Sequence, residues 1–233
     1  MVFLPFKDDN PLKFIWFQFT TLALILINVI VFIWQDSLGE KGLVSVAMLG
    51  GVVPTNLLGD AKLPAELMRL PPEATLVTYM FLHGDWWHLA GNMLFLWVFG
   101  DNVEDAMGSI RFLIFYLLSG AAAGLAHAYA NLDSAAPLIG ASGATAGVIG
   151  AYIMLYPRVK VWSLVFMRLP LKLPAFWIIA SWILIQFLFV FLSVEDGTAW
   201  FAHIGGFIAG ILLVVLFKRS DQPLFGGAPE RHS

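Results

Sequence analysis

Residues 138–156 read LIGASGATAGVIGAYIMLY, an uncharged run in which small residues recur every three to four positions. A run of this length crosses a hydrocarbon core of about 30 Å as a helix. Small residues at helical spacing let a neighbouring helix approach closely, which favours association of helices in a membrane. A matching series, Ala202, Gly206 and Gly210, occurs near the C-terminus. We therefore expect these two segments to pack tightly against each other.

The composition of the whole chain indicates a membrane protein. Hydrophobic residues make up 59% of the 233 residues, charged residues make up 12%, and the mean hydropathy is +0.81. Ordinary soluble domains carry about twice that share of charged residues. The formal net charge of -3 gives no basic stripe, so no nucleic acid partner is expected. The absence of cysteine excludes disulfides, zinc-thiolate sites and a cysteine nucleophile.

Five further apolar runs are long enough to be membrane spans. The first lacks a small-residue cleavage site at its end, so it is expected to be a retained span and not a signal peptide. The predicted fold is an all-α polytopic membrane protein with six transmembrane helices. The five runs cover residues 14–34, 88–103, 112–130, 173–194 and 200–217.

The distribution of Lys and Arg predicts the orientation of these spans. Short loops on the cytoplasmic side of a membrane carry an excess of cations. Here the cations gather before the first span, between the second and third, between the fourth and fifth, and after the sixth. Both termini are therefore expected to be cytoplasmic. The residues are Lys7, Lys13, Arg111, Arg158, Lys160, Arg168, Lys172, Lys218 and Arg219.

We expect three regions along the chain. Residues 1–13 form a cytoplasmic N-terminal segment, and residues 14–219 form the six-span membrane domain. The first loop, about residues 35–87, is too long for a plain connector and is expected to lie partly in the membrane interface. Residues 220–233 are polar, rich in Gly and Pro, and expected to be disordered.

Several polar residues lie at the outer ends of the predicted spans, where the topology brings residues far apart in sequence to the same depth. Polar groups inside membrane spans are costly and are candidates for function. His88 and Asn92 are four residues apart and share one helical face. The candidates are His83, His88, Asn92, Ser142 and His203.

These residue types suit nucleophilic catalysis. A serine hydroxyl becomes a nucleophile when a base, usually histidine, accepts its proton. Ser142 and His203 would form this pair across the contact between the fourth and sixth spans. His88, Asn92 and the backbone N–H of Ser142 could stabilise an oxyanion. Because no Asp or Glu is placed to orient His203, the sequence favours a dyad.

Three motifs together resemble the rhomboid intramembrane proteases over about residues 76–217. They are Gly140-Ala141-Ser142-Gly143, Ala202-His203-Ile204-Gly205-Gly206, and the series His83, His88 and Asn92. The resemblance implies that Ser142 attacks a peptide bond in or near a transmembrane segment of a substrate protein. It also implies that His203 relays the proton and that His88, Asn92 and the Ser142 N–H hold the oxyanion. We expect His83 to brace the first loop, and we expect His83, Gly140 and Gly143 to support the site.

The resemblance further implies no metal or other cofactor, with transmembrane proteins and the lipid bilayer as partners. The six-span chain resembles the simpler bacterial form, which implies a bacterial inner membrane and leaves the oligomeric state open. Some family members have an aromatic residue one turn after the nucleophile that packs against the base. This chain has Ala146 there, so the support of the His203 ring is left open.

Other interpretations remain. Ser142 alone would more often be a helix-packing serine. An inactive rhomboid-like protein could bind transmembrane segments without cleaving them. A metal-dependent hydrolase could use His83, His88 and His203 as ligands. A transporter or channel is disfavoured, because the polar groups lie near one surface and not at the midplane.

Overall fold

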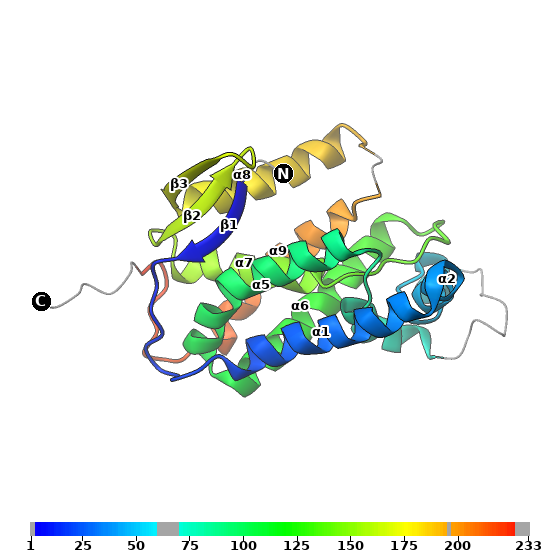
Figure 1. Ribbon diagram of the computed structural model, residues 1–233, viewed down its shortest axis with the longest axis horizontal. Coiled ribbons are helices and arrows are strands. Elements are labelled where there is room, and N and C mark those ends of the chain that lie inside the picture. Colours follow the sequence, from blue (N-terminus) through cyan, green and yellow to red (C-terminus); the bar gives the residue numbers. More distant parts are fainter. Residues whose placement is uncertain (1–2, 60–69, 195–196, 227–233) are drawn as a thin grey trace, which may run out of the picture.

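The computed structural model describes residues 3–59, 70–194 and 197–226. It is a helical bundle with a small antiparallel sheet beside it (Figure 1). Within the described ranges, six helices of fourteen or more residues account for the six predicted apolar runs. They are α1 (Phe19–Ser37), α5 (Trp86–Met107), α6 (Ser109–Ala130), α7 (Ser142–Leu155), α8 (Ala175–Phe191) and α9 (Trp200–Phe217).

Length and composition suit several of these helices to a bilayer. Of the helices in the described residues, α1, α6 and α9 are each long and apolar enough to cross a membrane. The apolar helices α7 and α8 are shorter. Helix α5 is 22 residues long and carries buried Glu104 and Asp105 near its C-terminal end. The helices expected from the sequence are thus present, and the count of six spans stays a prediction.

Helix α7 lies at the centre of the bundle, where it packs against α9 as the small residues predict. A Cβ atom on Gly206 would lie 2.0 Å from the Gly143 carbonyl oxygen. A Cβ atom on Gly210 would similarly lie 1.9 Å from the Gly147 carbonyl oxygen. Such distances are possible only because these positions lack side chains. The expected close packing of the two segments is confirmed.

The start of α7 differs from the expectation of a helix from Leu138. Leu138 instead forms an antiparallel bridge with Val52, and α7 begins at Ser142. Gly140, between them, has φ of +120°, a backbone conformation that residues with a side chain rarely adopt. The Gly140 N–H donates to the Tyr79 carbonyl oxygen at 2.9 Å. These contacts hold the residues before Ser142 in an extended conformation, so α7 begins at Ser142 and not at Leu138.

The first loop contains short helices, in agreement with the expectation that it is more than a connector. Its Tyr79 is fully buried, and the hydroxyl donates to the Gly120 carbonyl oxygen at 2.7 Å. Residues 60–69 of this loop lie outside the described residues. The elements are α2 (Gly39–Gly50), α3 (Pro54–Leu57), η2 (Pro72–Ala74), α4 (Thr75–Thr78) and η3 (Tyr79–Phe81).

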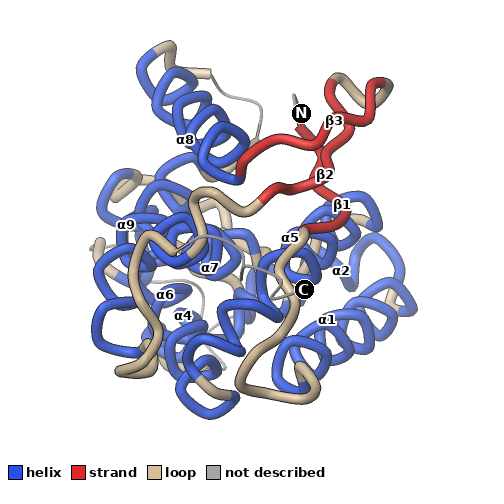
Figure 2. Tube along the Cα trace, turned by 90° about the vertical axis from the view of Figure 1, so that its left-hand side faces the viewer, coloured by secondary structure: helices blue, strands red, loops and turns tan. Residues whose placement is uncertain are grey.

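A three-stranded antiparallel sheet was not expected in an all-α fold. The strands β1 (Phe3–Asp8), β2 (Lys160–Val165) and β3 (Leu169–Pro174) pair in the order β1-β2-β3. The sheet joins the N-terminal segment to the connection between α7 and α8, and it lies beside the start of α8 (Figure 2). Strand β3 ends at Pro174 and α8 begins at the next residue. The sheet is therefore directly continuous with α8.

Two buried carboxylates of α5 fix the start of α1. Glu104 accepts hydrogen bonds from the backbone N–H groups of Thr20 and Thr21 at 2.9 and 2.8 Å. These N–H groups belong to the first turn of α1 and have no partner within the helix, so Glu104 acts as its cap. Asp105 accepts from the N–H groups just before this helix, which are those of Lys13, Phe14 and Ile15.

Part of the C-terminal tail packs against the bundle. Gln222 is 2% exposed, and the backbone N–H of Phe225 donates to the Met154 carbonyl oxygen at 2.7 Å. Residues 220–226 thus make specific contacts although the sequence favours disorder there. The expected disorder of residues 227–233 lies outside the described residues.

Candidate active site

Ser142 is the first residue of α7 and faces a cavity. Between Gly140 and Tyr152, Ser142 is the only residue that is not buried. Because the chain before Ser142 is extended, the Ser142 side chain lies at the N-terminal end of α7 and not on the face that packs against other helices. Its neighbours in the chain are buried, whereas Ser142 lines the cavity.

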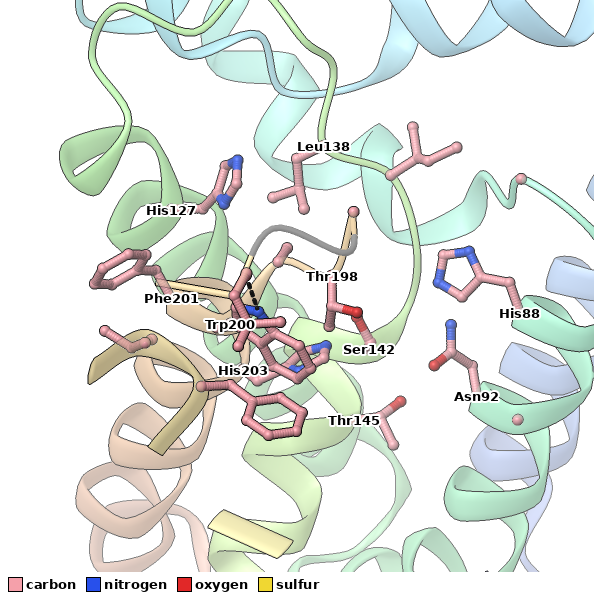
Figure 3. Close-up of a pocket in the computed structure, with 18 of the residues that line it drawn as sticks. His88, Asn92, His127, Leu138, Ser142, Thr145, Thr198, Trp200, Phe201 and His203 are labelled. Atoms are coloured by element: carbon pink, nitrogen blue, oxygen red, sulfur yellow. Dashed lines mark hydrogen bonds between the residues drawn. The ribbon is translucent and has the colours of Figure 1, made fainter. Parts of the chain in front are cut away.

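The cavity has a volume of about 1030 Å³ and brings the predicted residues together. Ser142 and His203 lie next to each other on the side formed by α7 and α9 (Figure 3). His88 and Asn92 reach in from α5 on the opposite side (Figure 3). The face of α5 that carries His88 and Asn92 therefore forms part of the cavity wall. Four of the side chains predicted from the sequence surround one space.

His203 is held by contacts that the sequence left open. Its Nδ1 lies 2.8 Å from Oε1 of Gln186, which is on α8. The Trp182 ring, also on α8, lies 5.9 Å from the His203 ring between centroids, with 35° between the planes. Trp200 approaches edge-on with its centroid at 6.2 Å. The ring support that Ala146 cannot provide thus comes from two tryptophans on other segments.

His83 is fully buried behind the cavity and contacts Asn92. The Asn92 side-chain nitrogen lies 3.0 Å from Nε2 of His83, and the Ala141 N–H lies 3.5 Å from the same atom. Burial, together with the neighbouring His88, lowers the pKa of His83 to about 3. A neutral ring can accept at Nε2, so one N–H of the Asn92 amide is directed to His83. The other N–H is then available to the cavity.

Gly140 and Gly143 are positions where a side chain would collide with the site. A Cβ atom on Gly140 would lie 2.6 Å from Nε2 of His88 and 3.6 Å from the Asn92 side-chain nitrogen. A Cβ atom on Gly143 would lie 2.8 Å from the Tyr79 hydroxyl. The two glycines flanking Ala141-Ser142 thus allow α5 and the first loop to approach the nucleophile candidate.

The three-histidine metal alternative gains no geometric support. In the part of the chain that the structure describes, no three His, Asp or Glu side chains gather as ligands of one ion. His83 and His88 are close, with ring centroids 5.1 Å apart. The Nε2 atom of His83 is, however, directed to Asn92.

Sequence reasoning missed Gln186 and Trp182. Both lie within an apolar run, residues 173–194, where the pattern predicts a lipid-facing span. The signal available was the polarity of Gln186 itself, since a side-chain amide inside a span is costly without partners. His127, which the sequence gave no role, also lines the cavity at its far end (Figure 3).

Comparison with known proteins agrees with this architecture. The rhomboid domain family matches residues 71–220. RHOMBOID-like protein 1 of Arabidopsis thaliana is 27% identical over 246 residues, which cover 98% of this chain and 60% of that protein. Rhomboid-like protease 3 of Toxoplasma gondii is 31% identical over 172 residues, covering 72% of this chain and 60% of that protein.

A shorter match of higher identity is found with a bacterial protein. Rhomboid protease GluP of Bacillus subtilis is 42% identical over 78 residues, covering 34% of this chain and 15% of that protein. The chain thus spans at most about three fifths of the length of these relatives. The family match covers more than half of the chain and includes both Ser142 and His203. The chain belongs to the rhomboid family and is a multi-pass integral membrane protein built from apolar helices.

Proposed function

We propose that this chain is an intramembrane serine endopeptidase that cleaves transmembrane segments of other proteins with a Ser142 and His203 dyad. The observation that carries the proposal is the placement of Ser142 and His203 side by side in a cavity whose opposite wall holds His88 and Asn92. Relatives named as proteases in Toxoplasma gondii and Bacillus subtilis support the same activity.

In the first step, the Ser142 oxygen attacks the carbonyl carbon of the scissile peptide bond. The hydroxyl O–H bond breaks, and Nε2 of His203 accepts the proton. The carbonyl oxygen becomes an oxyanion in a tetrahedral intermediate. In the proposed mechanism, donors from the Asn92 amide, His88 and the Ser142 N–H stabilise this charge more strongly than the uncharged substrate.

Collapse of the intermediate breaks the C–N bond. The imidazolium of His203 gives its proton to the leaving amine, and an acyl ester with Ser142 remains. Water then attacks the ester with His203 again as base, and the second product leaves. The chemistry needs a water supply, which the cavity of about 1030 Å³ is large enough to hold.

We further propose a topology of six spans with both termini cytoplasmic, in the inner membrane of a bacterium. The six apolar helices and the distribution of Lys and Arg support this topology. In this orientation, Ser142, His203 and His88 lie near the outer face of the membrane. The proposed partners are the lipid bilayer, in which the helices lie, and transmembrane substrate proteins.

The test is cleavage of a single-span membrane protein by the purified chain in detergent. Wild-type protein is compared with Ser142→Ala and His203→Ala, each with and without a strong chelator. Ser45→Ala is the matched control, because Ser45 is exposed on α2 and its hydroxyl bonds only to the Lys41 carbonyl. The proposal expects loss of cleavage in both dyad variants, normal cleavage by the control, and no effect of chelator.

Two other outcomes would replace the proposal. If wild-type protein binds several single-span substrates and cleaves none, the chain is a rhomboid-like binding protein. If the chelator abolishes cleavage while Ser142→Ala retains it, a metal-dependent hydrolase is indicated. A fluorophosphonate that labels wild-type protein at Ser142 would support an activated serine without depending on the choice of substrate.

A further inference from the structure

Gln186 stands out on α8 because it is a buried amide on a helix that is otherwise apolar apart from Ser181. It is 4% exposed, whereas the neighbouring Leu184 and Phe187 are 67% and 49% exposed. An unpaired amide would be strongly unfavourable in a lipid environment. The hydrogen-bond partners of its Nε2 and Oε1 atoms therefore indicate its role.

Both halves of the Gln186 amide have partners that fix its orientation. Nε2 donates to the backbone carbonyl oxygen of Trp182, one turn earlier in α8, at 3.3 Å. Because a carbonyl only accepts, the nitrogen of the amide must face Trp182. The Oε1 atom is consequently the atom that faces Nδ1 of His203, at 2.8 Å.

This orientation selects the tautomer of His203. Oε1 of Gln186 is only an acceptor, so Nδ1 of His203 must carry a proton to make the bond. In a neutral ring, Nε2 then holds the lone pair and is the basic nitrogen. The proposed reaction requires Nε2 to accept the Ser142 proton. The opposite tautomer would present an N–H to the serine and could not act as a base.

We propose that Gln186 is a positioning residue that holds His203 in the tautomer with the proton on Nδ1 and stabilises its imidazolium form. The inference rests on the proposed peptidase function. Gln186 does not line the cavity that contains Ser142, so it acts through His203 and not on substrate. The His203 pair with Ser142 thereby becomes a triad whose third member is a neutral amide.

The contact between Gln186 and His203 makes the orientation of the His203 ring depend on the position of α8. Gln186 and Trp182 are four residues apart, so they lie on one face of α8, and both contact His203. Much of the rest of α8 is exposed, and its buried residues are Ala175, Ile178, Ile179 and Gln186. His203 is therefore correctly oriented only while this face of α8 is seated against α9.

The variants Gln186→Leu and Gln186→Glu separate this role from packing. Leu removes the acceptor and keeps a similar volume. Glu keeps an acceptor and adds a negative charge. The matched control is Ser181→Ala, which removes a hydroxyl from the same helix that bonds only to the Ile178 carbonyl. Each variant is assayed for kcat, KM and the pH dependence of kcat/KM on the single-span substrate.

Gln186→Leu is expected to lower kcat about 10- to 100-fold with KM nearly unchanged, since hydrogen bonds to charged groups such as an imidazolium contribute this much. Gln186→Glu is expected to move the ascending limb of the pH profile to higher pH, because a carboxylate favours protonated His203. Ser181→Ala should behave as wild type. A kcat for Gln186→Leu within about twofold of wild type, or an unmoved limb for Gln186→Glu, overturns the proposal.

A readout that needs no activity distinguishes this inference from the proposed function. The chain has five histidines, and the ¹⁵N signals of His203 are assigned by their loss in His203→Ala. Wild-type His203 should show a protonated Nδ1, and Gln186→Leu should show a mixture of tautomers.

If wild-type protein shows this tautomer but neither cleaves nor reacts with fluorophosphonate, the peptidase proposal fails while the positioning by Gln186 stands. A protonated Nε2 in wild type overturns the positioning role. If Gln186→Leu does not fold, the pH profile of Gln186→Glu and the ¹⁵N spectrum of the wild-type protein test the positioning role.

Discussion

Gly206 of α9 contacts the backbone of Gly143 in α7 so closely that a Cβ atom on Gly206 would lie 2.0 Å from the Gly143 carbonyl oxygen. Gly143 directly follows Ser142, and Gly206 lies one helical turn after His203. The contact between these two glycines therefore sets how far apart the nucleophile and the base are held.

Gly206→Ala is expected to destabilise the protein and to lower activity. The added methyl group must push α7 and α9 apart, and overpacking of this kind costs about 1–3 kcal/mol. A displacement of about 1 Å between reacting groups can lower a rate about 100-fold. Thermal unfolding in detergent and the cleavage rate measure the two effects.

The stability control for this change is Gly91→Ala. A Cβ atom on Gly91 meets nothing within 4 Å, and the position is inside α5. Ala at a helix interior is favoured over Gly by about 1 kcal/mol, so the unfolding temperature should not fall. Equal stability of Gly206→Ala and Gly91→Ala would show that the close contact is not important.

His83→Phe is expected to lower kcat about tenfold without moving the pH profile. Phe fills the volume of the ring but offers no acceptor to the Asn92 side chain, which His83 contacts at 3.0 Å. A loosened Asn92 would stabilise the oxyanion less well. Because burial lowers the pKa of His83 to about 3, this ring stays neutral across the working pH range.

The measurement for His83→Phe is kcat/KM between pH 5 and 9. Loss of the ascending limb in this variant would mean that His83 itself titrates during catalysis. His83→Gln retains a polar side chain and should recover part of the rate if hydrogen bonding to Asn92 is what matters.

Asp8 is expected to make the protein less stable as pH rises. Asp8 lies in β1, and Tyr152 donates to its Oδ2 at 2.5 Å. Burial raises the pKa of Asp8 to about 7, and Asp101 adds to the rise although the Tyr152 hydrogen bond opposes it. The folded state thus holds a proton that the unfolded state releases near pH 4, so stability from this group falls between about pH 4 and pH 7.

Asp8→Asn keeps the acceptor for Tyr152 and removes the titration. We expect it to raise the unfolding free energy at pH 8 by about 1 kcal/mol, which corresponds to roughly 2–4 °C for a chain of this size. At pH 4 the two proteins should be equally stable. The control is Asp9→Asn, because Asp9 pairs with Lys172 nearer the surface. An identical pH trend for wild type and Asp8→Asn would refute the assignment.

His83 gives the opposite pH trend, so the two residues can be separated. Its folded pKa of about 3 lies below the unfolded value near 6.5, so its contribution is lost as pH falls below about 6.5. Between about pH 4 and 6.5 the two trends oppose each other. Asp8→Asn should therefore reveal stability that rises with pH in this window.

Glu104→Gln is expected to weaken the attachment of α1. The buried carboxylate accepts from the N–H groups of Thr20 and Thr21 and from the hydroxyls of Thr21 and Ser109. Gln offers one acceptor oxygen and turns an NH₂ group toward donors. A loss of about 3 kcal/mol, or roughly 6–12 °C in unfolding temperature, follows from hydrogen bonds to a charged group.

Glu73→Gln is the control for this change, since Glu73 is exposed in η2. Proteolysis of the chain before α1 gives a second measurement, because weaker capping should expose residues 10–18 to cleavage. Equal unfolding temperatures for Glu104→Gln and Glu73→Gln would contradict the capping role.

The sequence predicted the helices and most of the site because both depend on local patterns. Long apolar runs specify helices in lipid, and small residues at a spacing of four specify close helix contacts. The predicted six-span topology places Ser142, His203 and His88 at a common depth. This is why the predicted polar residues meet in the cavity, and why the Gly206 contact could be anticipated.

Contacts between distant segments were not predictable in this way. Strand β1 pairs with β2 across more than 150 residues, and residues 160–174 read as a charged loop. Glu104 and Asp105 follow the predicted span over residues 88–103, whereas their partners include backbone groups in or near α1. Gln186 lies in an apolar run, and its role depends on where α8 packs. In each case the deciding partner is far away in sequence.

The continuity of β3 with α8 has a practical consequence for handling the protein. A purification tag or fluorescent fusion at the N-terminus would be attached close to β1, which is hydrogen-bonded to β2. Strand β2 is in turn hydrogen-bonded to β3. We expect a force on the N-terminus to act on the sheet and, through β3, on α8, the helix that carries Gln186. Attachment after residue 233 would avoid this path, so a difference in turnover between N- and C-terminally tagged protein would report on the sheet as a mechanical link.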